Sequence, residues 1–70
     1  MDVYVFRTNI QSAETARTVA RHLDTHAHVA RWTIDFGDTD KVLRVEAERM
    51  DPAEIRQLVV TAGFMCEEMV

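Results

Sequence analysis

The sequence predicts an α+β domain in which four antiparallel strands form one sheet and two helices pack against one of its faces. Four segments have strand character, two of them with regular alternation of apolar and polar residues, and apolar residues recur at helical spacing in two others, in the order strand, helix, strand, strand, helix, strand. Each helical segment carries a single apolar stripe, so the two helices can cover only one face of the sheet. The other face should stay exposed, which gives the two-layer βαββαβ sandwich of the ferredoxin-like kind.

The composition fits one compact domain that spans residues 1–70. Hydrophobic residues make up 47% of the chain and charged residues 29%, and a chain of this length has room for only one core. Such a small core provides modest net stability, so self-association or a ligand could help to hold the fold together. A homo-oligomer is therefore one of the states that we expect.

The charge balance and the cysteine count exclude several classes of partner. Eight basic and twelve acidic residues give a net charge of −4 without a basic cluster, which argues against nucleic acid as a partner. Cys66 is the only cysteine and cannot build an internal disulfide framework. No apolar run reaches the length of a membrane span or resembles a signal peptide. The sequence therefore predicts a cytoplasmic protein that does not contact a membrane.

The first strand and the first helix are predicted from the apolar pattern of residues 3–25. Residues 3–8 are β-rich and apolar on both sides, which suits a central strand or one whose outer face meets a partner. From Ser12 to about Thr25, apolar residues recur at helical spacing. We expect Ser12 to accept a hydrogen bond from the first turn of this helix and Glu14 to complement its dipole.

The middle of the chain predicts a hairpin. Residues 31–36 alternate between polar and apolar, with the tryptophan, isoleucine and phenylalanine on one side. Residues 37–40 supply turn chemistry, and the alternation resumes over residues 42–48. These two strands should bury one face and leave the other in water.

The second helix carries signals at both ends. Asp51 fits the N-cap, Pro52 the first helical position and Glu54 the closing position of a capping box, while Gly63 lies just past the C-terminal end. Its buried stripe should consist of Ile55, Leu58, Val59 and Ala62. A last short strand is predicted over residues 64–69.

Several of these positions share their spacing with a known family. Leu23 is followed by Val29, then by Trp32, Ile34 and Asp35, and after a further strand by the segment AEIRQLVVTAGF, which ends in Ala62-Gly63-Phe64. This pattern resembles the heavy-metal-associated domain of copper chaperones and metal-pumping ATPases, where an apolar residue closes the first helix and the second helix ends in Ala-Gly-aromatic. The resemblance covers nearly the whole chain and implies the same βαββαβ fold.

The metal ligands of that family are missing at the matching positions. The family's Met-x-Cys-x-x-Cys motif falls on residues 10–15, where Ser12 and Thr15 replace the two cysteines. Thiolates suit Cu(I) because they are soft, and a helix N-terminus lowers the thiol pKa so that the ligand is already deprotonated. Hydroxyls are hard and neutral at pH 7. We therefore expect no metal site at Ser12 and Thr15.

Two other sets of residues could hold copper or zinc. Cys66 lies in the last predicted strand, which should begin beside the loop of residues 9–12, although a lone cysteine is more often a buried small hydrophobe. His22 and His26 are spaced i, i+4 and His28 follows, which is a recognisable ligand spacing. The last two histidines should lie in a solvated turn, at the far end of the helix from that loop. No cofactor is expected, and metal at either set stays an open alternative.

Three functions remain open. An enzyme is not expected, because no nucleophile with a base, no carboxylate pair in an apolar setting and no phosphate-binding glycine loop can be located. The first hypothesis is a heavy-metal-associated-like domain without the metal site that acts through protein–protein contacts or self-association. The second is a copper or heavy-metal binding or trafficking protein whose ligands have moved to Cys66, alone or across a dimer. The third, a small-molecule regulatory domain, is supported by fold analogy alone.

Overall fold

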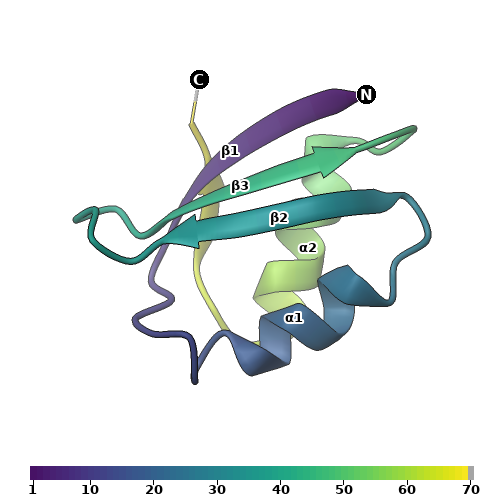
Figure 1. Ribbon diagram of the computed structural model, residues 1–70. Coiled ribbons are helices and arrows are strands. Elements are labelled where there is room, and N and C mark those ends of the chain that lie inside the picture. Colours follow the sequence, from purple (N-terminus) through teal and green to yellow (C-terminus); the bar gives the residue numbers. More distant parts are fainter. Residues whose placement is uncertain (70) are drawn as a thin grey trace.

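The structure is a computed structural model that describes residues 1–69. Its elements are β1 (Asp2–Thr8), α1 (Arg17–Asp24), β2 (Val29–Asp35), β3 (Val42–Ala47), α2 (Pro52–Thr61) and β4 (Cys66–Glu68) (Figure 1). The four strands form one sheet in the order β2-β3-β1-β4, with every neighbouring pair antiparallel. This confirms the predicted ferredoxin-like sandwich, with β1 as a central strand.

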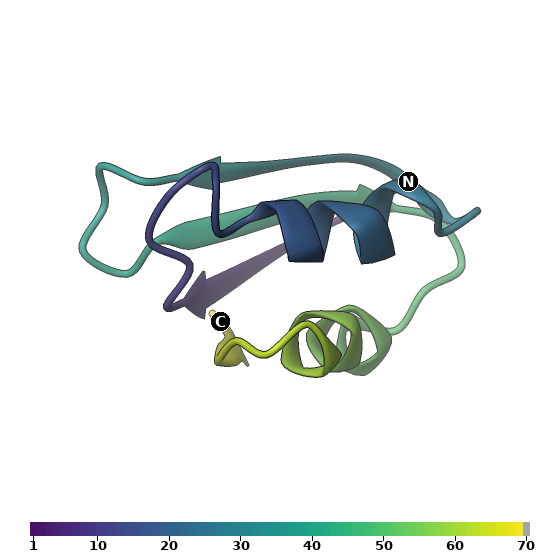
Figure 2. The ribbon, with the colours of Figure 1, turned by 90° about the horizontal axis from the view of Figure 1, so that it is seen from below.

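Both helices lie on the same side of the sheet. Seen from below, α1 runs along the β2 side and α2 along the side of β1 and β4 (Figure 2). Neither helix within residues 1–69 is long and apolar enough to cross a membrane. The opposite face of the sheet has no covering layer in Figure 1, as the two apolar stripes predict.

One apolar layer fills the space between the helices and the sheet. No polar or charged side chain is buried within residues 1–69. The buried side chains are Phe6, Ile10, Ala16, Val19, Leu23, Leu43, Val45, Ala47, Met50, Ile55, Val59 and Cys66. Tyr4 packs at the margin of this layer, where its hydroxyl donates a hydrogen bond to the Met50 carbonyl at 2.9 Å. Every helix and strand except β2 contributes a buried side chain to this core, and β2 packs the partly buried Val29, Trp32 and Ile34 against it.

The exposed face of the sheet carries charge around a small apolar centre. Val3 of β1 is 45% exposed on this face. Arg7 lies 3.9 Å from Glu67 across the β1–β4 pair, and Arg31 lies 3.8 Å from Glu46 across the β2–β3 pair. These solvated ion pairs keep the face compatible with water, although each contributes little to stability.

The capping signals of α2 are confirmed. The Asp51 side chain accepts a hydrogen bond from the Ala53 N–H at 3.1 Å, and the Glu54 side chain accepts one from the Asp51 N–H at 3.2 Å. Pro52 occupies the first turn, and Gly63 has a φ of 99° just past the helix. Such a positive φ strains most residues but not glycine. The local sequence therefore fixes both ends of α2.

The predicted start of the first helix at Ser12 is wrong. Regular helix begins at Arg17, and residues 13–16 form turns in which the Ala16 N–H bonds the Ser12 carbonyl at 3.0 Å and the Arg17 N–H bonds the Glu14 carbonyl at 3.3 Å. Serine and threonine side chains compete with the helix for backbone partners, and Ser12 and Thr15 do so here. Glu14 consequently lies before the first turn of α1 and not within it.

The strand ends differ from the predicted ones for identifiable reasons. β2 begins at Val29 and not at residue 31, because an irregularity in register between Val29 and Arg31 lets the ladder continue. β4 covers only three of the predicted residues 64–69. The N–H groups of Phe64 and Met65 bond the Val59 carbonyl at 3.3 Å and the Asn9 side chain at 2.8 Å, so the ladder starts after them.

Replacing Asp51 with alanine should lower the free energy of unfolding by about 1 kcal/mol, because the substitution removes the acceptor that satisfies the Ala53 N–H. Urea denaturation followed by circular dichroism measures this loss. The matched control is Glu48→Ala, which removes an exposed carboxylate just ahead of α2 and should change stability by less than about 0.5 kcal/mol. Equal effects of the two substitutions would contradict a stabilising role for the capping box.

Candidate functional site

Two loops meet at one end of the molecule, and one of them carries residues 10–15, on which the sequence analysis predicts that the family motif would fall. Thr8 at the end of β1 is paired with Cys66 at the start of β4. Beyond this pair, the Asn9 side-chain carbonyl accepts a hydrogen bond from the Met65 N–H at 2.8 Å. The last strand therefore begins beside the loop of residues 9–12, as the sequence predicts.

The first of these loops is anchored from within the protein. Ile10, which the predicted motif placement aligns with the family's methionine, is fully buried. Its N–H donates to the Thr8 hydroxyl at 3.2 Å, and that hydroxyl donates to the Lys41 carbonyl at 2.7 Å. These contacts attach the loop to the core and to the loop that carries Lys41.

Ser12 and Thr15 bond each other reciprocally, in an arrangement that we name the Ser12–Thr15 clasp. The Thr15 N–H donates to the Ser12 hydroxyl at 3.3 Å, and the Ser12 N–H donates to the Thr15 hydroxyl at 3.1 Å. The Thr15 hydroxyl also donates to the Ser12 carbonyl at 3.0 Å. Both side chains are exposed. Ser12 thus accepts a bond from a turn, as predicted, but that turn precedes α1.

The clasp does not fit Cu(I). The two hydroxyl oxygens lie 3.3 Å apart and are already engaged with the loop's own backbone. They are hard, neutral donors, whereas Cu(I) prefers soft thiolate or thioether ligands. The clasp therefore closes the loop on itself, and its two side chains offer no soft ligand.

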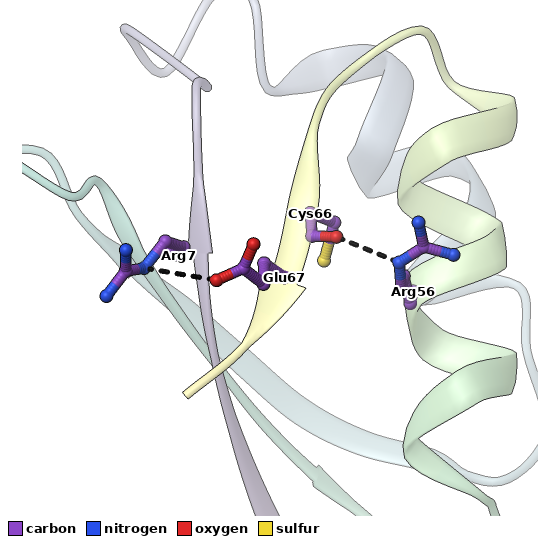
Figure 3. Close-up of polar contacts among 4 residues, drawn as sticks. All are labelled: Arg7, Arg56, Cys66 and Glu67. Carbon is purple, nitrogen blue, oxygen red and sulfur yellow. Dashed lines mark hydrogen bonds and ion pairs between the residues drawn. The ribbon is translucent and has the colours of Figure 1, made fainter. Parts of the chain in front are cut away.

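Cys66 lies close to the clasp loop but is buried. Its exposed fraction is 6%, and burial raises the pKa of its thiol to about 11, against the opposing charge of Arg56. The Arg56 guanidinium also donates a hydrogen bond from Nε to the Cys66 carbonyl at 3.0 Å (Figure 3). Near neutral pH the thiol is protonated and packs as a small apolar side chain.

The three histidines lie at the other end of α1. His22 is half-buried in the helix, and His26 and His28 lie in the turn after it, as predicted. The His26 and His28 ring centroids are 5.7 Å apart, and His26 Nδ1 accepts the His28 N–H at 3.2 Å. Within residues 1–69, no cluster of three or more His, Cys, Asp or Glu side chains is arranged to hold a metal ion.

A groove of about 390 Å³ opens between α2 and the outer side of β4. Its lining includes Arg7, Asn9, Arg56, Val60, Phe64 and Met65. Glu67 also lines the groove and lies 3.9 Å from Arg7, and Arg56 donates to the Cys66 carbonyl, so both arginines already have partners within the protein. Nothing in the sequence pattern predicts the Arg56 contact, because it depends on how closely α2 approaches β4 in space.

Comparison with known proteins places this geometry in a recognised fold. No family model matches the sequence, and no curated protein matches it. The chain is similar to the copper binding domain from HMA7, a P-type ATPase, with a TM-score of 0.85 at 15% identity over 100% of this chain and 96% of that one. The N-terminal domain of PacS from Synechocystis PCC6803 gives a TM-score of 0.82 at 14% identity over 100% of both chains. The fold is that of a heavy-metal-associated domain.

The heavy-metal-associated fold extends to a zinc protein as well. The N-terminal domain of ZntA in its Zn(II) form gives a TM-score of 0.78 at 21% identity, over 94% of this chain and 89% of that one. The resemblance inferred from residue spacing is thus confirmed at the level of the fold. With Cys66 as its only cysteine, the chain lacks the Cys-x-x-Cys motif.

Cys66 should react slowly with iodoacetamide in the folded protein. Raising the thiol pKa from 9.0 to about 11 lowers the thiolate population at pH 8 about 100-fold, and the thiolate is the reactive form. Mass spectrometry of timed samples should show alkylation at least about 100-fold slower than in urea-unfolded protein at the same pH. Equal rates would mean that the thiol is exposed and available as a ligand.

Proposed function

We propose that this chain is a non-enzymatic domain of the heavy-metal-associated fold that acts through protein–protein contacts, self-association included, and holds no metal at the loop where that fold carries its ligands. The observation that carries the proposal is the Ser12–Thr15 clasp. It fills the positions of the two cysteines with hydroxyls that bond one another's backbone. The scaffold around it is kept, while the donors that suit Cu(I) are gone.

The anchoring of the loop supports a metal-independent role. Ile10 is fully buried and Asn9 ties the loop to Met65. A loop that is ordered by its own packing presents the same surface whether or not a metal ion is available. A domain that works by contact benefits from such a surface, because less ordering is needed when a partner binds.

The absence of a desolvated polar centre supports a non-enzymatic role. Within the described part of the chain, no polar or charged side chain is buried. General acids, bases and nucleophiles usually depend on such environments for their pKa values. A reducing, cytoplasmic setting goes with this proposal, because Cys66 is a free, buried thiol.

Metal handling through Cys66 is the second candidate. The observation in its favour is position, since Cys66 is paired with Thr8 at the edge of the same loop. Its thiol is one ligand, and its burial opposes the deprotonation that binding requires. This candidate therefore needs a second chain or a local opening to complete a site.

Cu(I) titration against a chromogenic chelator should leave the metal with the chelator when the reduced wild-type protein is the competitor. The variant with Ser12→Cys and Thr15→Cys should instead take up one Cu(I) per chain, because two thiolates would then stand on this loop. Absorbance of the chelator complex measures both results. The same titration with a Zn(II) indicator extends the comparison to zinc.

A Cys66→Ser variant is the matched control for the titration. Submicromolar Cu(I) binding by the wild type that is lost in Cys66→Ser would overturn the proposed function and support the second candidate. Failure of the double-cysteine variant to bind would show instead that the family motif does not fall on residues 10–15.

A further inference from the structure

The two edge strands of the sheet, β2 and β4, differ in length and in how their outer sides are covered. β4 at one edge is three residues long, and Arg56 occupies the Cys66 carbonyl there at 3.0 Å. β2 at the other edge is seven residues long, and no strand of residues 1–69 pairs with its outer side. Figure 1 shows β2 as the outermost strand, with α1 beneath it and nothing alongside. The β2 edge is therefore the open one.

The hydrogen-bond pattern identifies the groups that face outward from β2. In an antiparallel ladder, successive residues direct their N–H and C=O groups to opposite sides. The Glu48 N–H bonds the His28 carbonyl at 2.9 Å, which sets the register in which β3 residues 46, 44 and 42 bond their β2 partners. These partners are Arg31, Thr33 and Asp35. Trp32 and Ile34 consequently direct their N–H and C=O groups to the open side.

The usable length of this edge is also defined. An irregularity between Val29 and Arg31 ends the regular strand on one side. On the other side, the Lys41 ammonium donates to the Phe36 carbonyl at 2.8 Å. Between these limits lie residues 31–35, whose midpoint is Thr33. β2 contains neither lysine nor proline, which commonly protect open edges.

We propose that a second copy of this chain pairs with β2 in antiparallel orientation, about a two-fold axis at Thr33. This inference rests on the proposed function and names the surface through which self-association occurs. Trp32 then exchanges backbone hydrogen bonds with Ile34 of the partner subunit, and Ile34 with the partner's Trp32. The two sheets become one sheet of eight strands.

Charge complementarity selects this register. With the axis at Thr33, Arg31 stands opposite Asp35 of the partner subunit, and the pair occurs twice by symmetry. An axis at Trp32 would put Arg31 opposite a threonine, and an axis at Ile34 would put it opposite a glycine. Opposite charges stabilise a cross-strand pair and like charges destabilise it. The Thr33 register alone matches both charges of the segment.

The helix side of the same edge supplies an apolar contact. A groove of about 160 Å³ lies between α1 and β2, lined by Ala13, Ala16, Arg17, Ala20, Trp32, Ile34 and Phe36. The Trp32 indole N–H already donates to Asp24 at 2.6 Å. A partner subunit can therefore cover the indole ring without leaving its N–H group unpaired. In the paired state, the partner's Ile34 lies beside Trp32 at this groove. A tryptophan anchor inside a charged rim is typical of interface centres.

The pairing is closed. Each chain has one open edge, and a two-fold axis uses both copies of it, so the product is a dimer and not a fibre. β4 offers no comparable continuation, because it is short and Arg56 covers part of its outer side.

Charge reversal tests the register. Arg31→Asp and Asp35→Arg each put like charges opposite one another twice, so each variant's dimer dissociation constant should rise at least about tenfold. An equimolar mixture of the two variants restores two opposite pairs and should return the dissociation constant to within about threefold of the wild-type value. Sedimentation velocity on the 8.1 kDa chain distinguishes monomer from dimer. Circular dichroism checks that each variant is folded.

Arg44→Asp is the matched control, since it reverses an exposed charge on the neighbouring strand β3 and should leave the dimer unchanged. Amide hydrogen exchange gives a second measurement. The Trp32 and Ile34 amides should be protected at high concentration and lose protection on dilution. The amides of Arg31, Thr33 and Asp35 bond β3 and should be protected at both concentrations.

A wild-type chain that stays monomeric at about 1 mM, or a dimer that neither reversal weakens, would overturn this inference. The first result leaves contacts with other proteins as the proposed function, and the second moves self-association to another surface. Metal uptake by the wild type would overturn the proposed function whether or not the chain dimerises through β2. The two failures are therefore distinguishable.

Discussion

The fold depends on one layer of apolar side chains between two helices and a single face of the sheet. α1 contributes Val19 and Leu23 to it and α2 contributes Ile55 and Val59, all fully or almost fully buried. No polar or charged side chain within residues 1–69 is buried in this layer, and Cys66 is its one thiol. The buried residues of the described part of the chain form a single cluster, and most of the polar and charged side chains lie on the loops, the open face of the sheet and the outer faces of the helices.

The contacts that attach the clasp loop to the rest of the protein do not involve Ser12 or Thr15. The loop's attachment to the core runs through Ile10, and its attachment to the neighbouring loop runs through Asn9. Because Ser12 and Thr15 are exposed, the residues at these two positions can change without loss of buried area. The fold as a whole is likewise shared, at TM-scores of 0.78 to 0.85, with four solved structures whose sequences are only 13% to 21% identical to this chain.

The ends of a helix were predicted correctly where they depend only on neighbouring residues in the sequence, and incorrectly where two local arrangements compete. Both ends of α2 followed from Asp51, Glu54 and Gly63, because capping is decided by side chains within a few residues of the helix end. The start of α1 did not follow from Ser12, because hydroxyls that can cap a helix can equally hold a turn, and the pattern does not say which arrangement has the lower free energy.

The site was predicted less completely than the fold. Residue spacing predicts that the family motif would fall on residues 10–15, and it left the state of Cys66 open. Its burial and its raised pKa depend on the approach of α2 to β4, which brings Arg56 onto the Cys66 carbonyl. Alternation along β2 likewise predicted which side chains face the core. It could not predict which backbone groups face outward, because that depends on strand order.

An open strand edge also makes a domain prone to uncontrolled association. In β2, the charges of Arg31 and Asp35 oppose one form of it. Stacking of identical strands in parallel and in register, as in cross-β fibres, would put Arg31 opposite Arg31 and Asp35 opposite Asp35. The same two charges match in an antiparallel pair centred on Thr33. One arginine and one aspartate at equal distances from a central residue thus favour a closed pair and oppose the stacked arrangement. This arrangement gives the edge specificity without the lysine or proline that other edges use.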